Sequence, residues 1–251
     1  MGHIISVINH KGGVGKTTST ANIGAGLSLL KKKVLMIDID PQANLTRHFG
    51  ISKTLEESIY GALNNEYPLP IINIKKGLEI VPSHQNLIGW EKKVSDEPGR
   101  ELFLKEIIEP VADKYDYILI DCPPSLNLLP VNALSVSQSI LVTVEPSLFS
   151  IEGMSNIFTA VHKVRTRINN DLNGCKILIT RFFSSKILHR NAEEIIRDNY
   201  VELVFKTVIR TNVALEEAVM KGVDIFTYDS KSNGAKDYKS VCNEIIKCKK
   251  W

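Results

Sequence analysis

The chain has 251 residues, of which 43% are hydrophobic and 24% are charged, and its formal net charge is +3. No apolar run approaches the roughly 18–20 residues that a membrane-spanning helix needs. The four cysteines form no C-x-x-C pair and no zinc spacing. The chain enters an apolar stretch at residue 3 without a signal peptide. We therefore expect a cytoplasmic globular protein with reduced thiols.

The charge is unevenly distributed along the chain. Residues 1–159 carry 14 Lys and Arg against 17 Asp and Glu, whereas residues 160–251 carry 17 against 11. A basic C-terminal third favours a polyanionic partner such as nucleic acid. An ordinary solvated surface is the alternative, and charge alone does not decide between them.

Short apolar runs alternate with longer helical patterns. Runs such as "VLMID", "YILID" and "ILVTV" are typical of parallel strands that are buried on both faces. The predicted strands are His3–Asn9, Val34–Asp38, Leu78–Val81, Tyr117–Asp121, Ile140–Glu145, Lys176–Arg181 and Val204–Ile209. The predicted helices are Lys16–Leu30, Glu101–Asp113, Leu126–Ser135, Ile151–Ile168, His189–Asn199 and Val213–Lys221.

This alternation predicts an α/β fold, with a doubly wound, mainly parallel sheet and helices on both faces. No repeat, low-complexity tract or linker divides the chain, so we expect a single domain over residues 1–251. The segment Ile51–Pro98, with prolines at 68, 70, 82 and 98, is the least regular. It is expected to hold short helices and loops at one edge of the sheet.

Residues 9–18, "NHKGGVGKTT", nearly match the phosphate-loop pattern G-x-x-x-x-G-K-[ST]. The loop lies between a predicted strand and a predicted helix, as that pattern requires. Its glycines let backbone N–H groups converge on phosphate oxygens, and the start of the helix adds partial positive charge. Lys16 would reach the β- and γ-phosphates, and the Thr17 hydroxyl would bind Mg²⁺. Two features depart from the pattern: His10 replaces the first glycine, and Lys11 adds a second cation.

Three carboxylates follow buried strands. Asp38 and Asp40 come at the end of "VLMID", and Asp121 ends "YILID". The carboxyl ends of parallel strands are where doubly wound folds bind ligands. An acidic residue that closes an apolar strand is the Walker B arrangement, which holds Mg²⁺ directly or through water.

The segments "KGGVGKTT", "DIDPQANLT" and "YDYILIDCPPSLNLLPVNAL" resemble the deviant Walker A ATPases, specifically the ParA/Soj-like partition proteins in the wider group that includes MinD. The resemblance covers essentially the whole chain, because "VIRTNVALEEAVMKGVDIFTYDSKSNGAKDY" is similar to that family's C-terminal part. It implies a P-loop ATPase that binds ATP and Mg²⁺ and forms an ATP-dependent homodimer. In such a dimer Lys11 would reach across to the phosphates of the partner subunit.

The resemblance also implies residue roles. The catalytic candidates are Lys11, Lys16 and Asp40, of which Asp40 would position the attacking water. The nucleotide-binding candidates are Lys11, Gly12, Gly13, Val14, Gly15, Lys16, Thr17, Thr18 and Arg181. The metal-site candidates are Thr17, Asp38 and Asp121. The segment "KILITRFF" departs from the family pattern, and Arg181 either stacks on the base as a planar cation or forms a surface salt bridge.

The function implied by the resemblance is plasmid or chromosome partition by a slow ATPase that partner binding stimulates. The ATP dimer would bind DNA without sequence preference and associate with the nucleoid, and a ParB-like centromere-binding protein would trigger hydrolysis. The candidate DNA contacts are Arg165, Arg167, Lys186, Arg190, Arg210 and Lys236.

The main alternative is a MinD-like positioning ATPase on a membrane, which needs an amphipathic C-terminal helix. The tail "KDYKSVCNEIIKCKKW" instead suits a helix that closes the domain, so membrane binding is not expected. An iron–sulfur role would need a second cysteine at a suitable distance from Cys122. A metabolic kinase would have a complete Walker A motif and no need for Lys11.

Overall fold

The computed structural model describes residues 2–52, 55–147, 150–248 and 251. In these residues seven strands form one sheet in the order β3-β4-β2-β5-β1-β6-β7. All neighbouring strands run parallel except β3 and β4, which form an antiparallel hairpin. The strands are β1 (His3–Ile8), β2 (Val34–Asp38), β3 (Ile72–Lys75), β4 (Leu78–Val81), β5 (Tyr117–Asp121), β6 (Ser139–Val144) and β7 (Gly174–Ile179).

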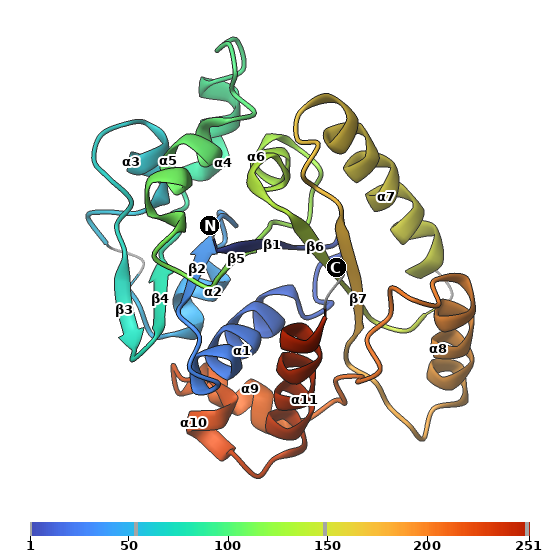
Figure 1. Ribbon diagram of the computed structural model, residues 1–251. Coiled ribbons are helices and arrows are strands. Elements are labelled where there is room, and N and C mark those ends of the chain that lie inside the picture. The colour runs from blue at the N-terminus through green and yellow to red at the C-terminus, as the bar shows by residue number, and fades with distance from the viewer. Residues whose placement is uncertain (1, 53–54, 148–149, 249–250) are drawn as a thin grey trace.

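Helices cover both faces of the sheet (Figure 1). Alternate residues of the central strand β1 divide between two apolar cores: Ile4 and Ile8 belong to one, and Ile5 and Val7 to the other. Helices α3 to α8 cover the first core, and α1, α2 and α9 to α11 cover the second. The helices are α1 (Lys16–Leu29), α2 (Asn44–His48), α3 (Ile59–Leu63), α4 (Leu87–Lys93), α5 (Phe103–Ala112), α6 (Leu128–Val136), α7 (Ser150–Arg167), α8 (Ile187–Asn199), α9 (Val213–Met220), α10 (Ile225–Asp229) and α11 (Asn233–Lys247).

The predicted fold class is confirmed. The first and last residues of each predicted helix lie within two residues of those of an observed helix. The irregular segment 51–98 does contain short helices, α3 and α4, at the β3–β4 edge of the sheet. The short strand β3 was not predicted. Gly77 turns the hairpin with a φ of 78°, a left-handed conformation that glycine adopts without strain.

The predicted strand Val204–Ile209 is wrong. In the described residues this segment forms no ladder with β7: one isolated bridge joins Val204 to Ile177 of β7, and a second, just past the segment, joins Arg210 to Phe182. The Glu244 carboxylate of α11 accepts hydrogen bonds from the backbone N–H groups of Lys206 (2.8 Å) and Thr207 (2.9 Å). These two N–H groups are bound to a side chain, and the backbone hydrogen bonds to β7 resume only at Ile209, so no continuous ladder forms here.

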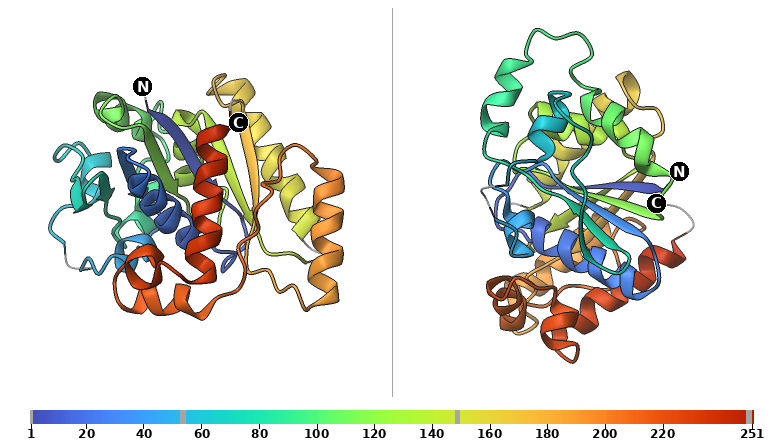
Figure 2. Two further views of the ribbon diagram at one scale, coloured as in Figure 1. Left: turned by 60° about the horizontal axis from the view of Figure 1, so that its bottom comes forward. Right: turned by 90° about the vertical axis from the view of Figure 1, so that its left-hand side faces the viewer.

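The C-terminal helix α11 packs against the helices on one face of the sheet (Figure 2). Helix α11 lies along α1, and a Cβ placed on Gly26 of α1 would lie 2.6 Å from Cys242 Sγ, so a glycine is needed at this crossing. Trp251 lies near His3, with ring centroids 5.4 Å apart, and near Phe205, at 6.1 Å. Among the described residues no helix is both long enough and apolar enough to cross a membrane.

Candidate nucleotide-binding site

The phosphate loop connects the carboxyl end of β1 to the start of α1. Gly13 and Gly15 have φ values of 76° and 80°, left-handed conformations that a side chain would strain. Gly12 has no such constraint, and a Cβ built on it would meet no described atom within 4 Å. The backbone conformation therefore requires glycine at positions 13 and 15. Neither conformation nor packing within the described residues requires glycine at position 12.

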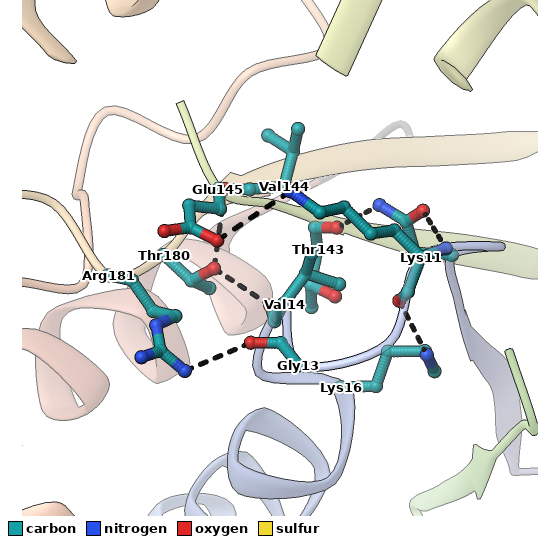
Figure 3. A network of polar contacts seen from close by, with 10 residues as sticks. Lys11, Gly13, Val14, Lys16, Thr143, Val144, Glu145, Thr180 and Arg181 are labelled. Carbon is teal, nitrogen blue, oxygen red and sulfur yellow. Dashed lines mark hydrogen bonds and ion pairs between the residues drawn. The ribbon is translucent and has the colours of Figure 1, made fainter. Parts of the chain in front are cut away.

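Side-chain hydrogen bonds tie this loop to strands that are distant in the sequence (Figure 3). Asn9 donates a hydrogen bond from Nδ2 to the Thr143 carbonyl of β6 (2.6 Å) and accepts one from the Lys11 backbone N–H (3.0 Å). Thr180, just after β7, donates to the Val14 carbonyl (2.8 Å). The loop is thus fixed to two neighbouring strands before any ligand arrives.

The two lysines of the loop differ in environment. Lys16 is buried, and its Nζ donates to the Lys11 carbonyl (3.2 Å). Burial lowers the pKa of Lys16, and the negative charges of Asp121 and Asp40 oppose that shift. Lys11 is more than half exposed, and its Nζ lies 4.0 Å from a carboxylate oxygen of Glu145. One lysine is therefore aimed into the loop, and the other lies at its rim.

Asp121 and Thr17 form a hydroxyl–carboxylate pair. Thr17 Oγ1 donates to Asp121 Oδ2 at 2.7 Å, and Thr20 Oγ1 lies 3.4 Å from Asp121 Oδ1. Burial and the neighbouring Asp38 charge raise the pKa of Asp121 well above its ordinary value. A cation beside this carboxylate would oppose that shift.

Asp38 is bound by its own chain. Its Oδ2 accepts from the backbone N–H and the hydroxyl of Thr46 (2.8 and 2.7 Å), and its Oδ1 accepts from the Asp40 N–H (3.1 Å). Burial raises the pKa of Asp38 to about 7, although the Thr46 hydrogen bonds lower it. Asp38 thereby fixes both the chain at Asp40 and the start of α2.

Asp40 lies at the cleft, and its Oδ1 accepts from the Gln42 N–H (2.9 Å). The Ser83 hydroxyl donates to the Asp40 carbonyl (2.6 Å). Both hydrogen bonds orient the residue at the carboxyl edge of the sheet, next to the phosphate loop.

A cleft of about 670 Å³ opens beside the phosphate loop. Its walls include the predicted residues Gly12, Gly13, Gly15, Lys16, Thr17, Thr18, Asp40 and Arg181. Val14 is buried beneath the loop, while Asp38 and Asp121 lie behind the cleft wall. Arg181, which has a φ of 53°, donates from Nη1 to the Gly13 carbonyl (3.1 Å). Its guanidinium thus points at the top of the loop.

The six predicted DNA contacts do not share one surface. Lys186 and Arg190 are exposed at the start of α8, at the carboxyl edge of the sheet where the phosphate loop lies. Arg165 and Arg167 lie in the last turn of α7, at the amino ends of the strands, where β7 begins. Arg210 lines the cleft and forms a two-pronged ion pair with Asp237, with contacts of 3.0 and 2.6 Å. The sixth residue, Lys236, is exposed in the first turn of α11.

Sequence reasoning missed Asn9, Thr46, Glu145 and Thr180. Asn9, Glu145 and Thr180 each follow the last residue of a parallel strand by one position. Since strand ends meet at the ligand edge of a doubly wound sheet, that position is a usable signal. Thr46 lies inside α2, and no pattern pointed to its bonds with Asp38.

A strand, a glycine-rich loop that leads into a helix, and an acidic residue at the end of the adjacent strand define a P-loop nucleotide hydrolase. Residues 2–174 match the family model of an AAA domain. The sporulation initiation inhibitor protein Soj of Bacillus subtilis (strain 168) is 39% identical over 251 residues, with 98% of each chain covered. The chromosome partitioning protein ParA of Myxococcus xanthus is 36% identical, with 98% of this chain and 89% of that protein covered. The chain belongs to the ParA/Soj-like partition ATPases.

Solved structures agree with this assignment. A putative plasmid partition protein from Borrelia burgdorferi B31, bound to AMPPNP, aligns with a TM-score of 0.83 at 27% identity, covering 98% of this chain and 99% of that one. Cobyrinic acid a,c-diamide synthase from Mycobacterium smegmatis, with a bound ATP analog and magnesium, aligns with a TM-score of 0.86 at 27% identity, covering 98% and 95%. The fold is thus shared with a biosynthetic enzyme, and it is the sequence relatives that identify the partition family.

Proposed function

We propose that the chain, acting as one domain, is an ATP-dependent dimerising switch for plasmid or chromosome partition. The observation that carries this proposal is the exposed Lys11 beside the open Gly12. A Cβ on Gly12 would touch none of the described atoms of its own chain, which suggests that another molecule approaches there. A second copy of the chain, with its own phosphates opposite Lys11, fits both residues.

ATP would lie in the cleft with its phosphates on the loop. Gly13, Gly15 and the first residues of α1 would supply N–H groups, and Lys16 would move from the Lys11 carbonyl to the phosphates. Arg181, at the top of the loop, would lie against the nucleotide.

The residues present fit Mg²⁺. Thr17 Oγ1 and Asp121 Oδ2 are hard oxygen ligands 2.7 Å apart, and Mg²⁺ is typically bound by one or two carboxylates together with phosphates and water. No group of three or more His, Cys, Asp or Glu side chains in the described residues could hold a metal, so phosphate would complete the shell. When bound, the ion would neutralise charge on the β- and γ-phosphates. Asp38 would support this site through its hold on Asp40.

Hydrolysis would require the assembled dimer. Asp40 would orient the attacking water, Lys16 would stabilise charge in cis, and Lys11 would supply the same stabilisation in trans. An isolated subunit lacks the trans cation, so its turnover should be slow. A ParB-like partner would accelerate hydrolysis and thereby dissolve the dimer.

DNA binding that depends on nucleotide should involve residues near the nucleotide, at the carboxyl ends of the strands. Lys186 and Arg190 lie at the carboxyl ends of the strands, whereas Arg165 and Arg167 lie at the amino ends. Dimerisation would bring two copies of the Lys186–Arg190 surface together and double its charge. Binding through phosphates would be independent of sequence and sensitive to salt, and it would place the protein on the nucleoid.

The membrane alternative is disfavoured by the packing of the C-terminal helix. Its apolar stripe, Tyr238, Val241, Cys242 and Ile245, is buried in the core with α1. Lys249 and Lys250 lie outside the described residues. An apolar stripe that its own domain already covers is not available to lipid.

The test is a titration of the protein against a random-sequence DNA duplex with ADP, with ATP, and with ATP at raised salt, beside anionic liposomes. The Lys186→Ala/Arg190→Ala variant should weaken ATP-dependent binding and lower the salt slope by about one for each phosphate that the protein no longer neutralises. Arg165→Ala/Arg167→Ala, with the same charge change at the opposite edge, is the control. Binding to liposomes but not to DNA would refute the partition assignment.

A further inference from the structure

Both peptide units that flank Asp40 are held by buried side chains. The carboxylate of Asp38 accepts a hydrogen bond from the Asp40 N–H (3.1 Å), and the Ser83 hydroxyl donates to the Asp40 carbonyl (2.6 Å). The residue after Asp40 is Pro41, which has no backbone N–H. The carbonyl is therefore the only backbone polar group of the peptide unit between residues 40 and 41, and Ser83 donates to it.

Thr46 joins Ser83 to Asp38, so that the four residues form a closed ring of hydrogen bonds with Asp40. Thr46 Oγ1 donates to Asp38 Oδ2 (2.7 Å) and accepts from the Ser83 N–H (2.9 Å). No member of this ring is more than 5% exposed. Because an unpaired polar group is costly away from water, a buried ring in which each member is bonded to two others has one favoured arrangement.

The ring joins two neighbouring strands at their carboxyl ends. Asp38 is the last residue of β2, and Ser83 follows the last residue of β4 by two positions. Strand β4 lies beside β2 and runs parallel to it, with Val81 opposite Ile37 (Figure 1). Ser83 belongs to the irregular segment 51–98, in which the sequence indicated no functional residue. The structure thus brings this segment into contact with the residue that the proposed function assigns to the attacking water.

The two backbone hydrogen bonds determine the direction of the Asp40 side chain. A peptide unit is planar, so the conformation of one residue depends on the two torsions between its neighbouring peptide planes. With the plane before Asp40 held through its N–H and the plane after it held through its carbonyl, both torsions are fixed. The Cα–Cβ bond then has one direction, and the Gln42 N–H, 2.9 Å from Asp40 Oδ1, fixes the carboxylate. The Asp40 carboxylate is therefore oriented by its own chain.

We propose that Ser83 is a positioning residue for ATP hydrolysis, whose hydroxyl holds the Asp40 carbonyl and so aims the Asp40 carboxylate at the attacking water. This inference rests on the proposed function, which gives Asp40 that role. The hydroxyl itself contacts neither nucleotide nor water in this scheme. Ser83→Ala removes the hydroxyl but keeps the N–H that binds Thr46, so the variant releases the Asp40 carbonyl alone.

The expected effect is on hydrolysis and not on nucleotide affinity. A misplacement of about 1 Å at a reacting group can lower a rate by about 10²-fold. Asp40 remains present in Ser83→Ala and only its orientation is relaxed, so hydrolysis should slow by about 10- to 100-fold. The proposed phosphate-binding groups, Gly13, Gly15 and Lys16, belong to the loop after β1, so the affinity for nucleotide should be nearly unchanged.

The first experiment measures ATP hydrolysis and the binding of a non-hydrolysable ATP analogue by the full-length protein with Mg²⁺. Ser83→Ala should hydrolyse ATP slowly and bind the analogue as wild type does. The control is Ser135→Ala, because Ser135 is also buried and its hydroxyl also donates to a carbonyl, that of Asn132 (2.7 Å). Equal rates for the two variants would overturn the proposal. So would a parallel loss of affinity and rate in Ser83→Ala, which would indicate a structural role.

A double-mutant comparison tests whether the Ser83 hydroxyl acts through Asp40. Asp40→Ala should be slow, and adding Ser83→Ala should lower its residual rate no further, because residues that act as a unit do not contribute additively. A further loss of the full size would overturn the proposal. Rapid hydrolysis by Asp40→Ala would refute the role that the proposed function gives Asp40, and this inference with it. A slow Asp40→Ala variant beside a fast Ser83→Ala variant would overturn this inference alone.

Hydrogen exchange reads the restraint on the loop itself, in the protein without nucleotide. In Ser83→Ala the backbone amides of residues 40–46 should exchange faster than in wild type, whereas Ser135→Ala should leave their exchange unchanged. Unchanged exchange in Ser83→Ala would overturn the proposal, since the hydroxyl would then not restrain the loop.

Discussion

Asp38 and Asp121 lie opposite each other in the register of β2 and β5, and neither side chain is exposed to solvent. Burial is the main cause that raises the pKa of each; the Asp40 charge adds to both shifts, and the Asp38 charge adds to that of Asp121. Two buried carboxylates on neighbouring strands favour a nearby cation. The nucleotide-free protein therefore carries an electrostatic cost at the place where Mg²⁺ would bind.

Asp121→Asn should relieve that cost. A carboxyl whose folded pKa is raised keeps its proton where the unfolded chain has lost it, so stability falls as pH rises from the unfolded value through the folded one. The variant lacks this pH-dependent destabilisation. Without nucleotide it should be more stable than wild type, and by more at pH 8 than at pH 5.

Thermal unfolding at both pH values measures this difference. Asp198→Asn, which changes an exposed carboxylate at the end of α8, should not reproduce it. The same Asp121→Asn variant should lose ATP hydrolysis. A variant less stable than wild type at pH 8 would contradict the electrostatic explanation.

His48 should make the protein acid-sensitive. Burial lowers the pKa of His48 to about 4, and its Nε2 has no hydrogen-bond partner among the described residues. Below the ordinary value of about 6.5 the unfolded chain takes up a proton that the folded chain does not. Stability is therefore reduced as pH falls from about 6.5 towards 4, by up to about 3 kcal/mol at the lower end.

The measurement is urea unfolding of wild type and His48→Gln at several pH values between 4 and 7.5. The variant should lose less stability than wild type on acidification. The difference between the two proteins is the relevant quantity, because Asp38 titrates in the same range with the opposite sign. Parallel pH profiles would contradict the prediction.

Gly153→Ala, a substitution in helix α7, should disturb the phosphate loop through the neighbouring His10 side chain. A Cβ on Gly153 of α7 would lie 2.2 Å from His10 Cε1, so the His10 ring would have to move. Nucleotide affinity should fall several-fold, and His10→Ala in the same chain should restore most of it because the ring is then absent.

Gly89→Ala is the matched control for this change. Gly89 lies inside α4, and its added Cβ would meet no described atom within 4 Å. It should stabilise the protein by about 0.5–1 kcal/mol without changing nucleotide affinity. Isothermal titration calorimetry with ADP separates the two variants, and equal affinities for both would count against the proximity of Gly153 and His10.

Glu244→Gln should loosen the segment beside β7. Each oxygen of its carboxylate accepts from one backbone N–H group, and the amide replaces one of these oxygens by an NH2 donor, so one N–H loses its acceptor. We expect a decrease of about 1–2 kcal/mol in unfolding free energy. Hydrogen exchange should also become faster at Lys206 and Thr207, whereas a mere change in surface charge would leave those two amides protected.

The sequence was sufficient for the local parts of the site. The phosphate loop is contiguous, its glycines and Lys16 follow a known spacing, and the buried strands ending in Asp38 and Asp121 were recognisable from their apolar runs. What could not be predicted was which strands are neighbours. That Asp38 faces Asp121 depends on β2 lying beside β5, an order that strand–helix alternation does not specify.

Interactions made by single polar side chains were the other source of error. Val204–Ile209 has the composition of a strand, yet Glu244, in the last helix of the chain, takes two of its N–H groups. The partner of Lys11 was missed for a similar reason, since Glu145 is brought near only by the pairing of β1 with β6. Both cases are long-range interactions of one residue, which leave no periodic signal in the sequence.

The interrupted segment beside β7 also limits how copies of this protein can associate. An exposed strand edge is a template on which another chain can add a strand and begin to aggregate. Here the β7 edge is covered by residues that already bond to Glu244, and the other edge is the four-residue strand β3. Neither end of the sheet, in the part of the chain that the structure describes, offers a long unpaired strand. Copies of this chain should therefore meet through loops and side chains, in associations that can form and dissolve repeatedly without leading to fibres.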